Sequence, residues 1–171
     1  MQMVKRGVFS LLLLGIALLL FAPKTELYYA LEHWMEPRGV ILSGERIHET
    51  PLRLELDDAT LYYDGVALGT IGAIGVESYL VTNRVVIRNF APSEDLGPLT
   101  GIAVRQATVR YALWHPETVR IHAVGTFGEV KGRFDPFRRT LLLRWVRVGN
   151  IEALRPYLNK DREGWYYERT F

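Results

Sequence analysis

The chain contains no cysteine among its 171 residues, so disulfides, thiol catalysis and thiolate metal sites are all excluded. The part of the chain after Arg6 also has no net charge. Lys5 and Arg6 account for the net charge of +2, because removing them from 21 basic residues leaves 19, which equals the 19 acidic ones. A neutral domain has no positive surplus for neutralising phosphates, so no nucleic-acid partner is expected.

Motifs of catalysis and of metal binding are missing as well. Neither G-x-S-x-G nor H-E-x-x-H occurs, and the glycine-rich stretches 69–75 and 125–132 lack the pattern of a phosphate-binding loop. No histidine has a second histidine or a carboxylate at metal-ligand spacing. The four are His33, His48, His115 and His122. We therefore expect a protein that is not an enzyme and that holds no metal and no cofactor.

One long apolar run is present, from residue 7 to residue 22, directly after Lys5 and Arg6. Such a run is typical either of a signal peptide or of a membrane anchor. Leu20 is large at the −3 position and Pro23 follows the run, so cleavage is disfavoured and an uncleaved anchor is expected. The positive-inside rule then predicts a single-pass protein of the bacterial inner membrane, with a cytoplasmic N-terminus and a periplasmic C-terminal domain.

The next segment, residues 23–39, is predicted to be an amphipathic linking helix. Thr25 can cap it, and Pro37 and Gly39 end it. Its aromatic residues suit the outer membrane interface, or its apolar side packs on the following domain, and the sequence leaves both alternatives open. The residues expected at the membrane interface are Lys5, Arg6, Tyr28, Tyr29 and Trp34.

From residue 40 onward the apolar residues recur with period two, which predicts strands. Asp64-Gly65 is a type I′ hairpin signal, and further turns are expected at 82–84 and at Asp135-Pro136. Residues 91–101 are expected to form a loop, and a short helix is expected from about 150 to 158.

The expected fold class is therefore mainly β. An N-terminal transmembrane helix and a linking helix precede a curved antiparallel sheet of six to nine strands, which ends in a short C-terminal helix and a final strand. The expected division is a cytoplasmic tip and anchor at 1–22, the linking helix at 23–39, and a periplasmic β domain at 40–171.

Four aromatic residues crowd the C-terminus: Trp165, Tyr166, Tyr167 and Phe171. A free tail of this composition would be an exposed apolar patch, which soluble domains avoid. The segment is therefore expected either to add to the sheet or to bind a partner. As a strand it would carry Trp165, Tyr167 and Phe171 on one face and Tyr166 on the other.

The order of these features resembles the type II secretion system protein N family (GspN) and, more loosely, AsmA-like proteins. The residues that carry the resemblance are the run ending in Phe21-Ala22-Pro23, the helical segment 25–36, residues 51–61 leading to Asp64-Gly65, and the glycine-spaced segment 125–132 before 141–143. The resemblance implies a bitopic inner-membrane protein with an accessory role in a type II secretion- or pilus-like machine, and it transfers no catalytic residue.

The sequence therefore leaves two alternative functions open. In the first, a structural subunit binds other envelope proteins through its β domain, for instance by strand addition at a sheet edge. In the second, an AsmA-like module binds or transports lipid on an apolar concave side. A packed interior favours the first function, and an open apolar groove favours the second. The residues expected to fill a packed interior are Leu54, Leu56, Val109, Tyr111, Leu113, Ile121 and Leu143.

Overall fold

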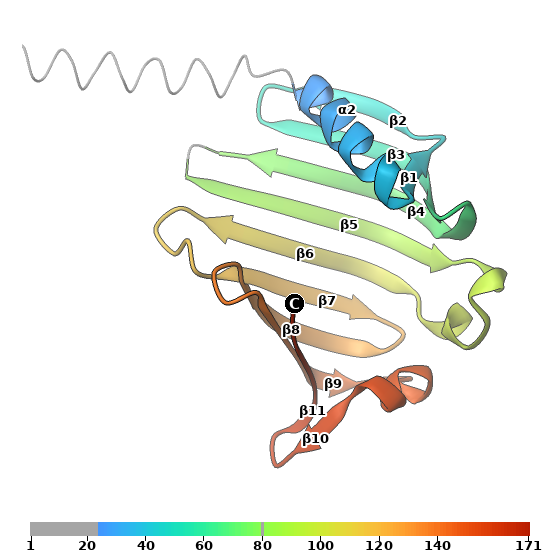
Figure 1. The fold of residues 1–171 in the computed structure, drawn as a ribbon, viewed down its shortest axis with the longest axis vertical. Coiled ribbons are helices and arrows are strands. Elements are labelled where there is room, and N and C mark those ends of the chain that lie inside the picture. Colours follow the sequence, from blue (N-terminus) through green and yellow to red (C-terminus); the bar gives the residue numbers. More distant parts are fainter. Residues whose placement is uncertain (1–23, 80) are drawn as a thin grey trace, which may run out of the picture.

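The structure is a computed structural model that describes residues 24–79 and 81–171. Within these residues, eleven antiparallel strands form one open sheet in the order β1-β3-β4-β5-β6-β7-β8-β9-β11-β10, and β2 pairs with β3 as well (Figure 1). The strands are β1 (Val40–Ser43), β2 (Arg46–Thr50), β3 (Arg53–Tyr63), β4 (Val66–Ser78), β5 (Thr82–Pro92), β6 (Val104–Ala112), β7 (Val119–Gly125), β8 (Gly128–Asp135), β9 (Thr140–Val148), β10 (Asn159–Asp161) and β11 (Gly164–Thr170).

Helical segments are few and short. They are α2 (Lys24–Met35) and the 3-10 helices η1 (Glu36–Arg38), η2 (Glu94–Gly101) and η3 (Glu152–Tyr157). The first occupies the position predicted for the linking helix, and Gly39 ends η1 in the left-handed conformation with φ of 79°. The mainly β antiparallel fold class is confirmed for the described residues, and the predicted transmembrane helix at 1–22 lies outside them.

Turn chemistry explains why the sheet is a meander from β3 to β9. Asp64 and Gly65 have φ of 48° and 79°, so the predicted hairpin with two left-handed residues is confirmed. At the β8–β9 turn, the Asp135 carboxylate accepts the N–H groups of Phe137 and Arg138, both at 2.9 Å. Both dipeptides stop one strand and start the next, as their sequence predicts.

Two sequence-based expectations about the strands are wrong. The turn expected at 82–84 lies inside β5, because β4 ends at Ser78 and β5 already begins at Thr82, whose carbonyl accepts the Tyr79 N–H. The sheet also has more strands than the six to nine expected, because β1, β2 and β10 are too short to show a period of two. The loop expected at 91–101 is mostly the 3-10 helix η2.

The localisation predicted from the sequence is contradicted. None of the helices in residues 24–79 and 81–171 is long and apolar enough to cross a membrane. The helix α2 has 12 residues and so reaches about 18 Å, against a bilayer core of about 30 Å. The prediction of a single-pass inner-membrane protein with a cytoplasmic N-terminus and a periplasmic C-terminal domain is therefore corrected, and Lys5 and Arg6 lie outside the described residues.

The sheet register sorts the side chains of the central strands into two chemically different faces. Because directly opposite residues share a face, the pairs Val85↔Val109 and Val109↔Ile121 lie on one side, which we call the apolar face. Their chain neighbours lie on the other side, which we call the polar face. There Arg84 pairs with Arg110, and Arg110 pairs with Arg120.

Two separate clusters of buried residues cover the apolar face at its ends. At the β3 end, Leu54 and Leu56 are 4% and 3% exposed beneath Tyr28 of α2. At the β9 end, Phe127, Val130, Trp145 and Ile151 form the second cluster, and Trp165 and Tyr167 of β11 pack against it. Figure 1 shows α2 lying over β1 to β4, far from the β9–β11 end. The sheet therefore has no single core that runs along its length.

The Asp64-Gly65 hairpin gives a direct test of the fold. Gly65 has φ of 79°, and no neighbouring atom lies within 4 Å of the position that a Cβ atom would take, so any penalty at this site comes from the backbone alone. Gly65→Val is expected to lower the free energy of unfolding by about 1 kcal/mol or more, since β-branched residues disfavour positive φ. Gly65→Asn is the matched control and should retain most of the stability. Equal stability of the valine variant in denaturant unfolding would contradict the turn assignment.

Candidate functional site

The most unusual feature of the polar face is a row of four arginines on four neighbouring strands. Arg84 of β5, Arg110 of β6, Arg120 of β7 and Arg133 of β8 are directly opposite one another in the register. We call these four residues the arginine row. Adjacent strands lie about 4.8 Å apart, so the row spans about 14 Å. Like charges directly opposite each other destabilise a sheet, and three such pairs follow in succession here.

Among the described residues, an acidic residue forms an ion pair with this row only at its β5 end. Arg84 lies 3.6 Å from the Glu77 carboxylate, which precedes it in the same register line. Arg110, Arg120 and Arg133 are exposed and make no ion pair or side-chain hydrogen bond with another residue in the described part of the chain. Glu55, another carboxylate on this side, is bound to Arg53 and Arg88 instead.

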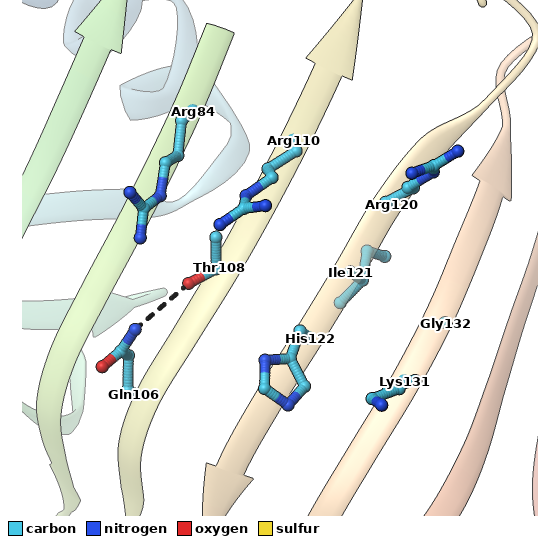
Figure 2. Close-up of a pocket in the computed structure, with 9 residues that line it drawn as sticks. All are labelled: Arg84, Gln106, Thr108, Arg110, Arg120, Ile121, His122, Lys131 and Gly132. Atoms are coloured by element: carbon cyan, nitrogen blue, oxygen red, sulfur yellow. Dashed lines mark hydrogen bonds between the residues drawn. The ribbon is translucent and has the colours of Figure 1, made fainter.

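Part of the row lines a hollow in the polar face, with a volume of about 320 Å³. Figure 2 shows Arg84, Arg110 and Arg120 on three successive strands that line it, with Arg120 pointing away from the other two and with His122 and Lys131 farther along β7 and β8. Gln106 and Thr108 form its floor, where the Gln106 amide lies 3.4 Å from the Thr108 hydroxyl. No carboxylate lines this hollow, so its charge is entirely basic.

A second hollow of about 470 Å³ continues the first toward the hairpin turns. It shares Arg84, Arg110 and Arg120 with the first hollow, so these three side chains stand between the two. The one carboxylate among its lining residues is Glu77, which already faces Arg84.

Glu129 fixes the side chains at the far rim. Its carboxylate lies 3.0 Å from His122 Nε2 and 2.8 Å from Arg147, and Lys131 is 4.0 Å away. The hydrogen bond from His122, followed by that from Arg147, lowers the pKa of the Glu129 carboxyl below its ordinary value. The carboxylate is therefore ionised at neutral pH, and it holds His122 at the edge of the hollow.

The apolar face offers a different kind of surface. Of the residues expected to fill a packed interior, Leu54 and Leu56 are buried, while Leu113 is 56% exposed. The central side chains of β5, β6 and β7 are partly exposed and belong to neither buried cluster. They are Val85, Ile87, Val109, Tyr111, Val119 and Ile121. A single packed interior, one of the two alternatives left open by the sequence, is thus absent from the described residues.

Trp165, Tyr166 and Tyr167 lie in the strand β11, so the structure shows addition to the sheet, one of the two alternatives expected for this segment. Trp165 and Tyr167 pack against the cluster around Trp145, whereas Tyr166 lies on the other face, where the Arg144 guanidinium is 5.5 Å from its ring centroid. Phe171 follows the strand and is 63% exposed.

The structure shows one of the two alternatives left open for this helix, packing of its apolar side on the following domain. Tyr28 is buried against Leu54 and Leu56, and its hydroxyl donates to Glu45 at 2.7 Å. Burial, followed by this hydrogen bond, raises the pKa of Tyr28 well above its ordinary value. Tyr29 and Trp34 are exposed. One side of the helix therefore packs on the sheet.

Sequence inspection missed the arginine row because its successive members are 10 to 26 positions apart and share no motif. The equal numbers of acidic and basic residues after Arg6 also gave no sign of a basic site, because the acidic residues that balance the charge lie outside the row. The available signal was one arginine at the polar phase of each of four consecutive predicted strands. No group of three metal-ligating side chains lies together in residues 24–79 and 81–171.

No family model, curated protein or solved structure matches the chain. The site alone therefore carries the argument about function.

Repulsion within the arginine row has a measurable consequence for stability. Arg110 has an arginine on each side and no acidic partner among the described residues, so Arg110→Gln is expected to raise the melting temperature by about 1–3 °C at low ionic strength. The gain should shrink as salt screens the charges.

The matched control is Arg162→Gln, an exposed arginine outside the row. It should leave the melting temperature unchanged in the same thermal scans. A fall in melting temperature for Arg110→Gln at low salt would mean that the row is not self-repelling.

Proposed function

We propose that the protein is a non-catalytic, AsmA-like lipid-binding module that holds acyl chains on its apolar face. The observation that carries this proposal is the position of Val85, Val109 and Ile121, partly exposed in the middle of the sheet between two separate buried clusters. Covering apolar surface stabilises by about 25 cal/mol per Å². An acyl chain laid across these strands would remove that surface from water.

Exposed aromatic residues at one end of the sheet support the same proposal. The β4–β5, β6–β7 and β8–β9 connections all lie at this end (Figure 1), and each carries a largely exposed aromatic residue. These residues are Tyr79, Trp114 and Phe137, and Phe171 joins them through the hydrogen bond of its N–H to the Arg139 carbonyl. Aromatic side chains of this kind are enriched where proteins meet the lipid–water interface. The end is suited to receiving a lipid from a membrane surface.

Site-specific photocrosslinking of the full chain in the producing cells tests this proposal. A benzophenone side chain at Ile121, on the apolar face, is expected to give adducts of lipid mass by mass spectrometry. The matched position is Leu142, an apolar residue of similar exposure on the polar face. Lipid adducts at Leu142 but not at Ile121, or none at either position, would overturn the proposal.

A second candidate function is the structural subunit of a type II secretion- or pilus-like envelope machine. The observation that favours it is the exposed edge of β11. The strand β10 pairs only with residues 164–166, so residues 167–170 are hydrogen-bonded to β9 alone within the described chain. An incoming strand can add at such an edge, with Phe171 beside it as an anchor.

Chemical crosslinking in the producing cells, followed by identification of the captured proteins, tests this second function. A component of such a machine should be recovered with the wild-type chain and lost with Phe171→Ala. Tyr157→Ala is the matched control, because Tyr157 is 67% exposed and Phe171 is 63% exposed. Equal recovery with both variants, or recovery of no such component with the wild type, would reject this role for Phe171.

A further inference from the structure

We propose that the arginine row binds an anion that carries two phosphate groups. This site lies on the polar face, opposite the proposed lipid surface, and does not depend on the lipid proposal. Its centre is formed by Arg84, Arg110 and Arg120, which stand between the two hollows. The sequence has no phosphate-binding loop motif, so the site is built by the sheet register alone.

Charge is the first argument. Arg110 and Arg120 are directly opposite each other and have no acidic partner among the residues described. Glutamate or threonine at either position would remove this repulsion without breaking the strand. Strand positions on the same face already hold such residues, namely Glu77 in β4 and Thr108 in β6. An anion between the guanidinium groups converts the repulsion into attraction, because each guanidinium can donate two parallel N–H groups to phosphate oxygens.

The distance spanned by the three arginines indicates the size of the anion. The three arginine positions extend over two strand spacings, about 10 Å, which is wider than one phosphate group. A single phosphate would engage two neighbouring guanidinium groups and leave the third unpaired. Two linked phosphates are long enough to place one group at Arg84 and Arg110 and the other at Arg120, on the shared wall of the hollows. The volume of about 320 Å³ leaves room for such an anion and for its hydration.

Other residues that line the first hollow contribute further hydrogen-bond donors. Lys131 and His122 approach the hollow from β8 and β7, and Gln106 contributes an amide from β6. Glu129 holds His122 at 3.0 Å, outside the hollow itself, so it orients the rim without placing a negative charge in the lining. The lining therefore offers positive charge and hydrogen-bond donors from three sides.

The shape of the site favours a compact anion over a macromolecule. The arginines border a hollow, whereas an acidic protein surface would need a flat or convex basic area. Nucleic acid is disfavoured because a continuous phosphate backbone needs a basic track, and the row is bounded by Glu77 at one end and by Leu142 and Glu168 at the other. Both phosphates can belong to a soluble diphosphate or to lipid headgroups, and the experiment distinguishes these sources.

Titration calorimetry on the full chain in non-ionic detergent tests the proposal, with pyrophosphate and orthophosphate as probes. Pyrophosphate is expected to bind at least about tenfold more tightly than orthophosphate, because it engages a third guanidinium group. The affinity for pyrophosphate should fall steeply with added salt. Equal affinity for the two probes, or no heat with either, overturns the proposal.

Variants assign the binding to the row. The double variant Arg110→Gln/Arg120→Gln should lose pyrophosphate binding while keeping its circular dichroism spectrum and a cooperative thermal transition. The control Arg162→Gln should bind as the wild type does, since it removes one exposed arginine elsewhere. If the double variant does not fold, Arg120→Gln alone serves, with an expected loss of affinity of about tenfold. Loss of binding in Arg162→Gln to the same degree overturns the assignment.

Two competition arms identify the source of the phosphates. If phosphatidylcholine vesicles containing cardiolipin displace pyrophosphate, and the double variant abolishes their binding, the ligand is a lipid headgroup. If these vesicles do not compete while pyrophosphate binds, the ligand is a soluble diphosphate. A single-stranded oligonucleotide that displaces pyrophosphate and binds more tightly than it does overturns the proposal in favour of nucleic acid.

Discussion

The structure depends on one constraint, an antiparallel hydrogen-bonded register that carries side-chain alternation from strand to strand across the sheet. Because each opposite pair shares a face, Val85, Val109 and Ile121 align on one side while Arg84, Arg110 and Arg120 align on the other. A slip of one residue in any hairpin would exchange the two sets from that strand onward. Turn residues such as Asp64, Gly65 and Asp135 therefore determine the chemistry of both faces as well as the fold.

The apolar face of the sheet is covered at its two ends and partly exposed along its central strands. The helix α2 buries Leu54 and Leu56 at one end, and the segment from Phe127 to Ile151 forms the other cluster with help from β11. The strands between them have one partly exposed apolar side and one basic side. Two surfaces of opposite chemistry are therefore separated by the thickness of a single backbone layer, and both proposals rest on this separation.

The period of two and the Asp-Gly and Asp-Pro dipeptides were sufficient to predict a mainly β antiparallel fold, the first and third hairpins, and the C-terminal strand. They were insufficient at 82–84, because the polar residues Thr82, Asn83 and Arg84 have the composition of a turn but lie inside β5, while Tyr79 and Val81 lie in the connection that precedes it. The arginine row could not be predicted, since it exists only once four registers are known. Overall neutrality pointed away from it, because Glu55 and Glu129 balance the total charge while pairing with other groups.

The central claim is that adjacent residues of β7 face different ligands, and cysteine labelling along this strand tests it most directly. The absence of native cysteine makes each single-cysteine variant unambiguous. With a thiol placed in turn at Val119, Arg120, Ile121 and His122, the account predicts that a fatty acid slows labelling at 119 and 121 only. Pyrophosphate should slow it at 122 only, since the cysteine at 120 itself removes an arginine of the row. Protection of adjacent positions by the same ligand would contradict the account.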